Sequence, residues 1–456
     1  MTEVISSLKL EKKLFGTNGV RGVVGKDMTP ELALSIGLAL GSMRRGRIAV
    51  GRDTRTSGPA LAGALKAGLM ATGCEVTDCG ILPTPALQYL VRKHFDAGAV
   101  ITASHNPPEY NGVKVIEPDG TEMGDEQTIL LEDRLFGHRF DLVPWNGVGR
   151  EHAAPDLVHE YIDAVVGHFP AGIGTGLTVV VDPGSGAACF TTPEILTRLG
   201  CRVLTINGRM DGLFPGRLPE PSPDGLAPLG DLVRATGADI GIAHDGDADR
   251  AVFIDENGRY IEENQEFALI ADRICRETRG TVVTPVSTSL LVETIAGNHG
   301  CDIRYTPVGS IYVARTMLAL EADGASVAFG GEGNGGLIYP SHQYCRDGGM
   351  TAAMVVAILA GKQRPLSALI DDMPKFTMIK GKLRVDNPQA LIATIEERYS
   401  GESIDRTDGI RINRKDSWVL VRPSGTEPLV RVFVESPDAE TARLFYEEIL
   451  DRIQGG

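Results

Sequence analysis

Residues 48–76, IAVGRDTRTSGPALAGALKAGLMATGCEV, decide the fold that the sequence predicts. An apolar run at 48–51 indicates a buried strand, and the apolar spacing from Ala60 to Met70 indicates a helix. Gly73 stands where a helix commonly ends in a left-handed residue, and a second strand-like run begins after Cys74. A strand, a helix and a strand in this order form a βαβ crossover, whose two strands are parallel.

The same plan occurs twice more, in residues 178–203 and 281–303. Copies that lie about a hundred residues apart indicate related α/β domains, because solenoid repeats have much shorter periods. Each copy carries a Gly-Cys pair at the turn into its second strand. The cysteines at these turns are expected to be small buried hydrophobic residues: Cys74, Cys201 and Cys301.

The C-terminal part departs from this plan. Strand-like runs at 409–412, 418–421 and 429–434 precede a helical pattern at 438–453, which predicts an α+β domain with an antiparallel sheet. The fold class is therefore α/β, with three repeated mixed α/β domains followed by a smaller α+β domain. We place the four domains at residues 1–150, 151–255, 256–373 and 374–456.

The composition limits the function and the location. The 456 residues carry a net charge of −15, which argues against a nucleic-acid partner, and no apolar run is long enough to span a bilayer. The start of the chain lacks the pattern of a signal peptide. The seven scattered cysteines contain no CxxC pair and favour a reducing cytoplasmic compartment. The sequence leaves a homodimer open.

The segment TASHNPP, residues 102–108, places Ser104 beside His105 in a loop that proline keeps out of helical conformation. The apolar run at 98–101 before it predicts a short buried strand, so Ser104 is expected at the carboxyl end of a strand. Ligands of open α/β sheets bind at these ends. A serine next to a histidine is common in surface turns, so this segment gains weight only from the two motifs that follow.

The segment DGDADR, residues 245–250, offers Asp245, Asp247 and Asp249 at alternating positions. In an extended loop the three carboxylates would point to one side, where they would suit Mg²⁺. An EF-hand calcium loop is excluded because Arg250 stands where such a loop needs glycine. A solvated acidic turn is the remaining alternative. Arg250 is expected to neutralise a phosphate that the metal contacts.

The segment RPSGTEP, residues 422–428, combines a guanidinium with hydroxyls and backbone amides, as a phosphate site requires. Arg431 follows three residues later and is expected to assist. Serine, metal site and phosphate site together indicate phosphoryl transfer.

Other loops add candidate residues. Arg21 lies in the glycine-rich FGTNGVRG (15–22), and Glu332 and Asn334 lie on an apparently flexible loop, GGEGNGG (330–336), suited to sugar hydroxyls. GRDTRTSG (51–58) is either a further site loop or a turn held by an internal Arg-Asp pair. Lys114 is a candidate acid or base if its pKa is lowered, and otherwise a surface lysine.

The motifs FGTNGVRG, GRDTRTSG, TASHNPPEYNGVK, DGDADR, GGEGNGG and RPSGTEP occur in this order over the whole chain. This set resembles the α-D-phosphohexomutases. The glycine-rich loops are most similar to the archaeal branch of that family, whose members are called phosphoglucosamine mutases. The resemblance implies four domains around a central cleft, which agrees with the three repeats and the distinct C-terminal part.

The resemblance also implies residue roles. Ser104 would be carried as a phosphoserine, and one of its oxygens would join Asp245, Asp247 and Asp249 around one Mg²⁺. Glu332 and Asn334 would bind the sugar. The acid/base and charge-neutralising residues would be Lys114, His105, Arg21 and Arg250. The remaining substrate-binding residues, mainly at the phosphate, would be Arg422, Ser424, Gly425, Thr426, Arg431 and Gly309.

One departure from the family pattern affects the mechanism. Many relatives end the sugar loop in Ser-Gly-His, whereas this chain has Asn334-Gly335-Gly336. No histidine of this loop can act as the base, so we assign the acid/base role to Lys114 or His105.

The resulting hypothesis is an isomerase that interconverts glucosamine 6-phosphate and glucosamine 1-phosphate through a 1,6-bisphosphate sugar, with hexose 1,6-bisphosphate as activator. Its close alternative is the same chemistry on mannose or glucose phosphates. A phosphatase that transfers the phosphoryl group to water, and a non-catalytic phosphosugar sensor, are alternatives from other classes. In each case the partner is a small phosphosugar.

Overall fold

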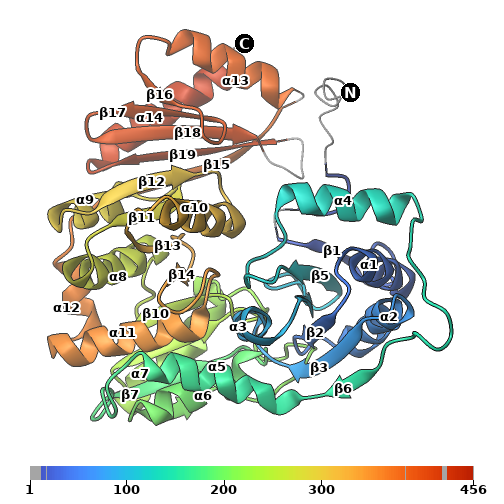
Figure 1. Ribbon diagram of the computed structural model, residues 1–456. Coiled ribbons are helices and arrows are strands. Elements are labelled where there is room, and N and C mark those ends of the chain that lie inside the picture. The colour runs from blue at the N-terminus through green and yellow to red at the C-terminus, as the bar shows by residue number, and fades with distance from the viewer. Residues whose placement is uncertain (1–11, 17, 386, 424–428, 455–456) are drawn as a thin grey trace. The chain divides into compact units, whose positions relative to one another are not determined.

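The computed structural model describes residues 12–16, 18–385, 387–423 and 429–454. It divides into two compact units, one comprising 1–229 with 242–251 and the other 230–241 with 252–456. Four β-sheets follow one another along the chain, three of them with α/β topology and the last purely antiparallel (Figure 1). This confirms the predicted fold class.

The first sheet is mixed and has six strands in the order β1-β5-β4-β2-β3-β6. Its strands are β1 (Val20–Val23), β2 (Arg47–Arg52), β3 (Glu75–Ile81), β4 (Ala97–Ile101), β5 (Tyr110–Ile116) and β6 (Glu151–Ala153). The helices of this region are α1 (Pro30–Met43), α2 (Gly58–Ala71), α3 (Thr84–His94), α4 (Asp125–Phe136), the short 3₁₀ helix η1 (Pro155–Leu157) and α5 (Val158–Gly167).

The central strands of the first sheet are buried on both faces. On β4, Ala97, Ala99 and Ile101 belong to the core formed with α1, α2 and α4. Gly98, which points to the other face, lies against Val91 of α3. This burial on both faces explains why β2 and β4 are apolar runs rather than alternating ones.

The second sheet has the order β10-β9-β7-β8, and the boundary of the two units passes through it. Its elements are β7 (Thr178–Asp182), α6 (Ala188–Arg198), β8 (Arg202–Thr205), η2 (Pro223–Leu226), α7 (Ala227–Thr236), β9 (Ile240–His244) and β10 (Ala251–Asp255).

The third sheet has the order β12-β11-β13-β14. Its strands are β11 (Thr281–Pro285), β12 (Asp302–Thr306), β13 (Val327–Glu332) and β14 (Gly336–Ile338). The helices are α8 (Glu263–Glu277), α9 (Leu290–Asn298), α10 (Ser310–Ala322), α11 (Gly348–Lys362) and α12 (Leu366–Asp371).

The predicted repeat is confirmed by the pairing of its strands. In each copy the two strands are parallel neighbours, with Ile48 opposite Val76, Val179 opposite Val203, and Val282 opposite Ile303. The three turn cysteines are buried, as expected. The helix of the second copy, α6, begins at Ala188, and Pro193 lies inside it.

The fourth sheet is antiparallel, in the order β15-β19-β18-β17-β16. Its elements are β15 (Thr377–Arg384), α13 (Pro388–Arg398), β16 (Ser403–Asp405), β17 (Ile410–Arg414), β18 (Ser417–Pro423), β19 (Leu429–Ser436) and α14 (Ala439–Gln454). The predicted strands and C-terminal helix correspond to β17, β18, β19 and α14. Strands β15 and β16 and helix α13 were not predicted from the sequence.

None of the described helices is both long enough and apolar enough to cross a membrane.

Two helices of the first unit pack at glycines. A Cβ atom built on Gly68 of α2 would collide with the backbone oxygen of Leu34 and lie 2.7 Å from the backbone nitrogen of Leu38, both on α1. Gly63 of the same helix is exposed and has open space around it.

These two glycines provide a matched pair of substitutions. We expect Gly68→Ala to lower the free energy of unfolding by about 1–3 kcal/mol, because α1 must move away. Gly63→Ala is expected to raise it by about 0.5–1 kcal/mol through helix propensity. Urea unfolding followed by circular dichroism measures both. Equal stability of the two variants would contradict the packing described here.

Candidate active site

The serine loop follows β4, at the carboxyl end of the first sheet, as predicted. Ser104 is buried and has a φ of 51°, a left-handed conformation that is uncommon for serine. Its backbone nitrogen donates a 2.8 Å hydrogen bond to Oγ1 of Thr102. This conformation is therefore held by contacts of the loop.

Arg55 holds the serine loop. The side chain is fully buried, and its Nε donates to Oδ2 of Asp53 at 3.1 Å. Its two terminal nitrogens donate to four backbone oxygens of the loop: Pro107 (2.6 Å), Tyr110 (2.9 Å), Ser104 (2.8 Å) and Asn106 (2.6 Å). The internal Arg-Asp pair considered for the 51–58 segment is present, and its arginine also organises a second loop.

The three aspartates converge, although not in the predicted way. The loop after β9 is a turn rather than an extended segment, and Ala248 has a φ of 57°. One carboxylate oxygen from each of Asp245, Asp247 and Asp249 lies within 4.8 Å of the others, and all three residues are buried. The turn, and not strand-like alternation, brings them together. Burial excludes the solvated acidic turn.

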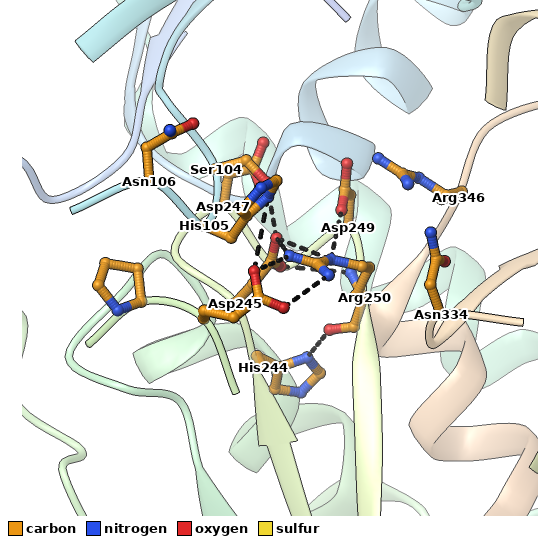
Figure 2. Close-up of polar contacts among 12 residues, drawn as sticks. Ser104, His105, Asn106, His244, Asp245, Asp247, Asp249, Arg250, Asn334 and Arg346 are labelled. Atoms are coloured by element: carbon orange, nitrogen blue, oxygen red, sulfur yellow. Dashed lines mark hydrogen bonds and ion pairs between the residues drawn. The ribbon is translucent and has the colours of Figure 1, made fainter. Parts of the chain in front are cut away.

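The serine and aspartate loops meet within the first unit. Oγ of Ser104 donates to Oδ2 of Asp245 at 2.7 Å, and Nδ1 of His105 lies 3.4 Å from the same Oγ (Figure 2). A Cβ atom on Gly246 would lie 2.5 Å from the backbone oxygen of Ser104. Glycine between the first two aspartates therefore permits this close approach.

Arg217 joins the aspartate loop to the end of β7. Its Nε donates to Oδ2 of Asp182, at the end of β7, at 2.9 Å. Its Nη2 donates at 2.6 Å to the backbone oxygen of His244, the residue before Asp245. The turn that carries the aspartates is thus anchored to the neighbouring strand.

Lys114 lies on β5 and is buried against the aspartates, so it is not a surface lysine. Its Nζ is 2.8 Å from Oδ2 of Asp247 and 3.2 Å from Oδ2 of Asp249. Burial alone would lower the pKa of Lys114, but the charges of these carboxylates outweigh it and raise the pKa. The structure therefore gives Lys114 a raised pKa, and not the lowered pKa on which the acid/base prediction depended.

Arg250 is engaged by carboxylates. Its Nη2 lies 3.2 Å from Asp245 (Figure 2). Its terminal nitrogens lie 3.1 and 3.2 Å from the two oxygens of Glu220. The same guanidinium contributes to the lowered pKa of His105, about 4, for which burial is the larger cause. The imidazole is therefore neutral at neutral pH.

The aspartate cluster fits a divalent cation with hard oxygen ligands. Burial, together with the other two carboxylates, raises the pKa of Asp245 to about 7, although Arg250 and Ser104 oppose this. Oδ1 of Asp247 is buried and has no hydrogen-bond partner. A cation among these oxygens would satisfy the orphaned atom and offset the repulsion.

Arg21 reaches the serine loop from a strand. It belongs to β1 rather than to an irregular loop, and its Nη1 donates to Oδ1 of Asn106 at 3.1 Å. It is therefore in contact with the loop of Ser104, as its predicted role requires.

In the second unit, the predicted sugar loop is an ordered hairpin and not a flexible segment. Glu332 ends β13 and pairs with Gly336, which begins β14. Glu332 is buried, and its Oε2 accepts from Nη1 of Arg346 at 2.8 Å and from Nδ2 of Asn334 at 3.2 Å. Glu332 and Asn334 are thus held together by direct contacts.

The predicted phosphate site lies only partly in the described residues, since Ser424, Gly425 and Thr426 fall outside them. Arg422 and Arg431 stand directly opposite each other on β18 and β19, and the Nε of each is buried and has no hydrogen-bond partner among the described residues. Asp408 lies 2.9 Å from Arg422 and accepts from the backbone nitrogen of Val308 at 3.0 Å. Two opposed cations with free donors favour an anion between them.

Val308 precedes Gly309, which caps α10 with a φ of 139°. Asp408 therefore joins the segment of Gly309 to Arg422, two positions that the sequence assigned to substrate binding.

Several residues that contribute to the site were not predicted from the sequence. Oγ1 of Thr84 donates to Asp247 at 2.6 Å although 163 positions separate them, and Glu220 lies 30 positions from Arg250. Arg217, Arg346 and Asp408 were missed for the same reason. When the partner of a carboxylate or an arginine lies on a loop that is distant in the sequence, no local sequence pattern predicts their contact.

The chain matches the phosphoglucomutase/phosphomannomutase family over four segments. They are alpha/beta/alpha domain I at 12–141, domain II at 159–258, domain III at 262–376 and the C-terminal domain at 382–452.

Similar proteins align over nearly the whole chain. A Thermococcus kodakarensis protein named phosphoglucomutase/phosphomannomutase is 46% identical, covering 95% of this chain and 97% of its own. A Methanopyrus kandleri protein named probable phosphoglucosamine mutase is 40% identical, covering 97% and 98%. A crystal structure of a phosphoglucomutase/phosphomannomutase family protein from Burkholderia thailandensis has a TM-score of 0.87 at 28% identity, covering 98% of both chains.

The role of Arg55 can be tested by a substitution that keeps its charge. We expect Arg55→Lys to lower the free energy of unfolding by about 3 kcal/mol, because a lysine leaves several buried carbonyls without donors. Amide hydrogen exchange in residues 102–110 should accelerate more than elsewhere. Arg52→Lys is the control, since Arg52 makes one 3.5 Å bond to a backbone oxygen. Unchanged exchange in Arg55→Lys would refute the role.

The metal site can be tested by calorimetry. We expect Mg²⁺ to raise the unfolding temperature of the protein, because a ligand of the native state stabilises it. Asp247→Asn should lose most of this increase, whereas Asp231→Asn, at an exposed aspartate paired with Arg234, should retain it. An equal increase in all three proteins would place the cation elsewhere.

Proposed function

We propose that this chain, which belongs to the phosphoglucomutase/phosphomannomutase family, interconverts glucosamine 6-phosphate and glucosamine 1-phosphate. Members of this family are phosphohexomutases, so the proposal concerns the sugar and the roles of the residues. Its main support is the 2.7 Å contact between Ser104 and Asp245 inside a buried cluster of three carboxylates. A nucleophilic hydroxyl directly beside a cation site is the arrangement that phosphoryl transfer requires.

In the proposed reaction, Ser104 carries a phosphoryl group. The free hydroxyl of the hexose monophosphate attacks this phosphorus, the bond from phosphorus to the serine oxygen breaks, and the hydroxyl proton is released. The resulting 1,6-bisphosphate turns around in the site. Oγ of Ser104 then attacks the phosphorus of the other phosphate, the bond from that phosphorus to the sugar oxygen breaks, the sugar oxygen takes up a proton, and the product leaves with Ser104 phosphorylated again.

The cation that the aspartates hold, which we propose is one Mg²⁺, would neutralise charge on the transferring group. Arg250, already beside Asp245, is placed to share that task. Lys114 lies against Asp247 and Asp249 and would keep the cluster from excess negative charge. His105 is the better placed of the two acid/base candidates, because its ring nitrogen lies 3.4 Å from Oγ of Ser104.

Binding of the substrate is assigned to the second unit. Glu332 and Asn334 would hydrogen-bond sugar hydroxyls, and Arg422 and Arg431 would bind the phosphate that is not being transferred. Ser424, Gly425, Thr426 and Gly309 are proposed to complete the phosphate site. The two buried guanidinium nitrogens without partners support this assignment.

The choice of sugar rests on relatives. The name of the Methanopyrus protein supports glucosamine phosphates, and the glycine-rich loops agree with that branch. The name of the more similar Thermococcus protein favours the second candidate, glucose or mannose phosphates. In both cases a hexose 1,6-bisphosphate is the proposed activator.

The proposed domains are residues 1–150, 151–255, 256–373 and 374–456, and the four sheets and four family segments support this division. We also propose a cytoplasmic location. It is supported by the seven scattered cysteines, which contain no CxxC pair.

A ³¹P NMR time course tests the activity and the sugar. Glucosamine 6-phosphate, glucose 6-phosphate and mannose 6-phosphate are supplied separately, with Mg²⁺ and a trace of hexose 1,6-bisphosphate. We expect the 1-phosphate of glucosamine to form fastest. Ser104→Ala should abolish turnover by removing the phosphoryl carrier, whereas Ser400→Ala, at an exposed serine, should match the wild type.

Other outcomes separate the alternatives. Faster conversion of glucose or mannose phosphate would keep the chemistry and change the substrate. Release of inorganic phosphate without a 1-phosphate would indicate a phosphatase. Binding without any turnover would indicate a sensor.

A further inference from the structure

The carboxylate of Glu332 is fixed by two donors on the same oxygen. Oε2 accepts from Arg346 and from Asn334, whose backbone nitrogen also donates to the backbone oxygen of Glu332 at 2.7 Å. Arg346 and Asn334 therefore both hold the Oε2 side of the carboxylate, and Arg346 fixes the orientation of that carboxylate.

Arg346 is itself held rigidly. It is buried, and the residue after it, Asp347, caps α11 by accepting from the backbone nitrogen of Met350 at 2.9 Å. The backbone nitrogen of Asp347 donates to the backbone oxygen of Leu337 on β14 at 3.0 Å. The backbone next to Arg346 is therefore hydrogen-bonded to β14 and to the start of α11.

The side chain of Arg346 also explains the glycine at position 336. A Cβ atom on Gly336 would collide with Cδ of Arg346 and lie 2.9 Å from its Cγ. Any larger residue at 336 would displace the arginine from Glu332. The lack of a side chain at Gly336 therefore leaves the space that the side chain of Arg346 occupies.

We propose that Arg346 is a positioning residue for sugar recognition: it orients the carboxylate of Glu332 so that this carboxylate accepts a hydrogen bond from a hydroxyl of the bound hexose. This inference rests on the proposed function, in which Glu332 contacts the sugar. Removing Arg346 would leave Glu332 free to rotate and without its counter-charge, so that sugar recognition weakens while phosphate recognition does not.

The test measures binding by calorimetry on the full-length protein with Mg²⁺, using glucosamine 6-phosphate and inorganic phosphate as separate probes. We expect Arg346→Met to weaken glucosamine 6-phosphate binding by about tenfold, a typical cost for losing a buried charged contact, and to leave inorganic phosphate binding unchanged. Arg346→Lys, which keeps the charge, should restore part of the loss.

A double-mutant cycle separates positioning from general destabilisation. In a Glu332→Gln background, Arg346→Met should have less than about a twofold further effect, because the carboxylate that it orients is gone. The control is Arg259→Met, which removes an arginine 2.8 Å from the buried Asp255 of β10, away from the hairpin. It should lose stability without losing affinity for the sugar phosphate.

The proposal is overturned if Arg346→Met weakens both probes equally, or if its effect is as large with Gln at position 332. Should Arg346→Met not fold, the Lys variant and the cycle built on it decide in the same way. Failure of the proposed function is a separate result: a wild-type protein that binds glucosamine 6-phosphate without converting it would refute the mutase activity and leave this comparison intact.

Discussion

The buried guanidinium of Arg55 is the contact on which the serine loop depends. Residues 104–110 are mostly exposed or half-buried, but four of their backbone carbonyl oxygens accept hydrogen bonds from the buried guanidinium. One arginine supplies all four of these hydrogen bonds, and Asp53 balances its charge. This is possible because β2 and β4 are adjacent and parallel, with Arg52 opposite Ile101, so both loops leave the sheet at one edge. The left-handed conformation of Ser104 follows from this support, and it aims Oγ at Asp245.

The second constraint is charge. Three buried carboxylates are too costly to hold together without cations, since each must give up its hydration. Lys114 and Arg250 lower that cost from two sides, and Thr84 donates a further hydrogen bond to Asp247. The orphaned oxygen of Asp247 and the raised pKa of Asp245 show that this compensation is incomplete. Because the negative charge of the aspartate cluster is only partly neutralised by Lys114 and Arg250, the cluster can be stable in the folded protein and still bind an added cation.

Local patterns in the sequence predicted the repeat, because a βαβ unit has a characteristic spacing of apolar residues in one continuous segment, with a glycine at the turn after the helix. They also predicted that Ser104 and the aspartates lie at strand ends. They failed where geometry depends on distant partners: the aspartates converge through a turn at Ala248, and the 330–336 segment is an ordered hairpin. The strand β15 was missed because Lys380, Gly381 and Lys382 interrupt its apolar signal. Gly381 stands there since a side chain would collide with Tyr446 of α14, a residue remote in sequence.

A carboxylate at or just after a strand end binds a buried arginine at three places in the α/β sheets. Asp53 follows β2, Asp182 ends β7 and Glu332 ends β13, and each binds a buried arginine: Arg55, Arg217 and Arg346. In the first two cases the arginine also donates to backbone oxygens of the neighbouring functional loop. Carboxyl ends of strands present carbonyl oxygens that lack partners, and a guanidinium has five donors in a rigid fork to meet them. A carboxylate at the strand end lowers the free-energy cost of burying the positive charge of the arginine. Glu332, which ends β13, differs from the two aspartates because it is the residue assigned to the sugar. Its arginine therefore sets the direction of a proposed binding group, whereas Arg55 and Arg217 support loops.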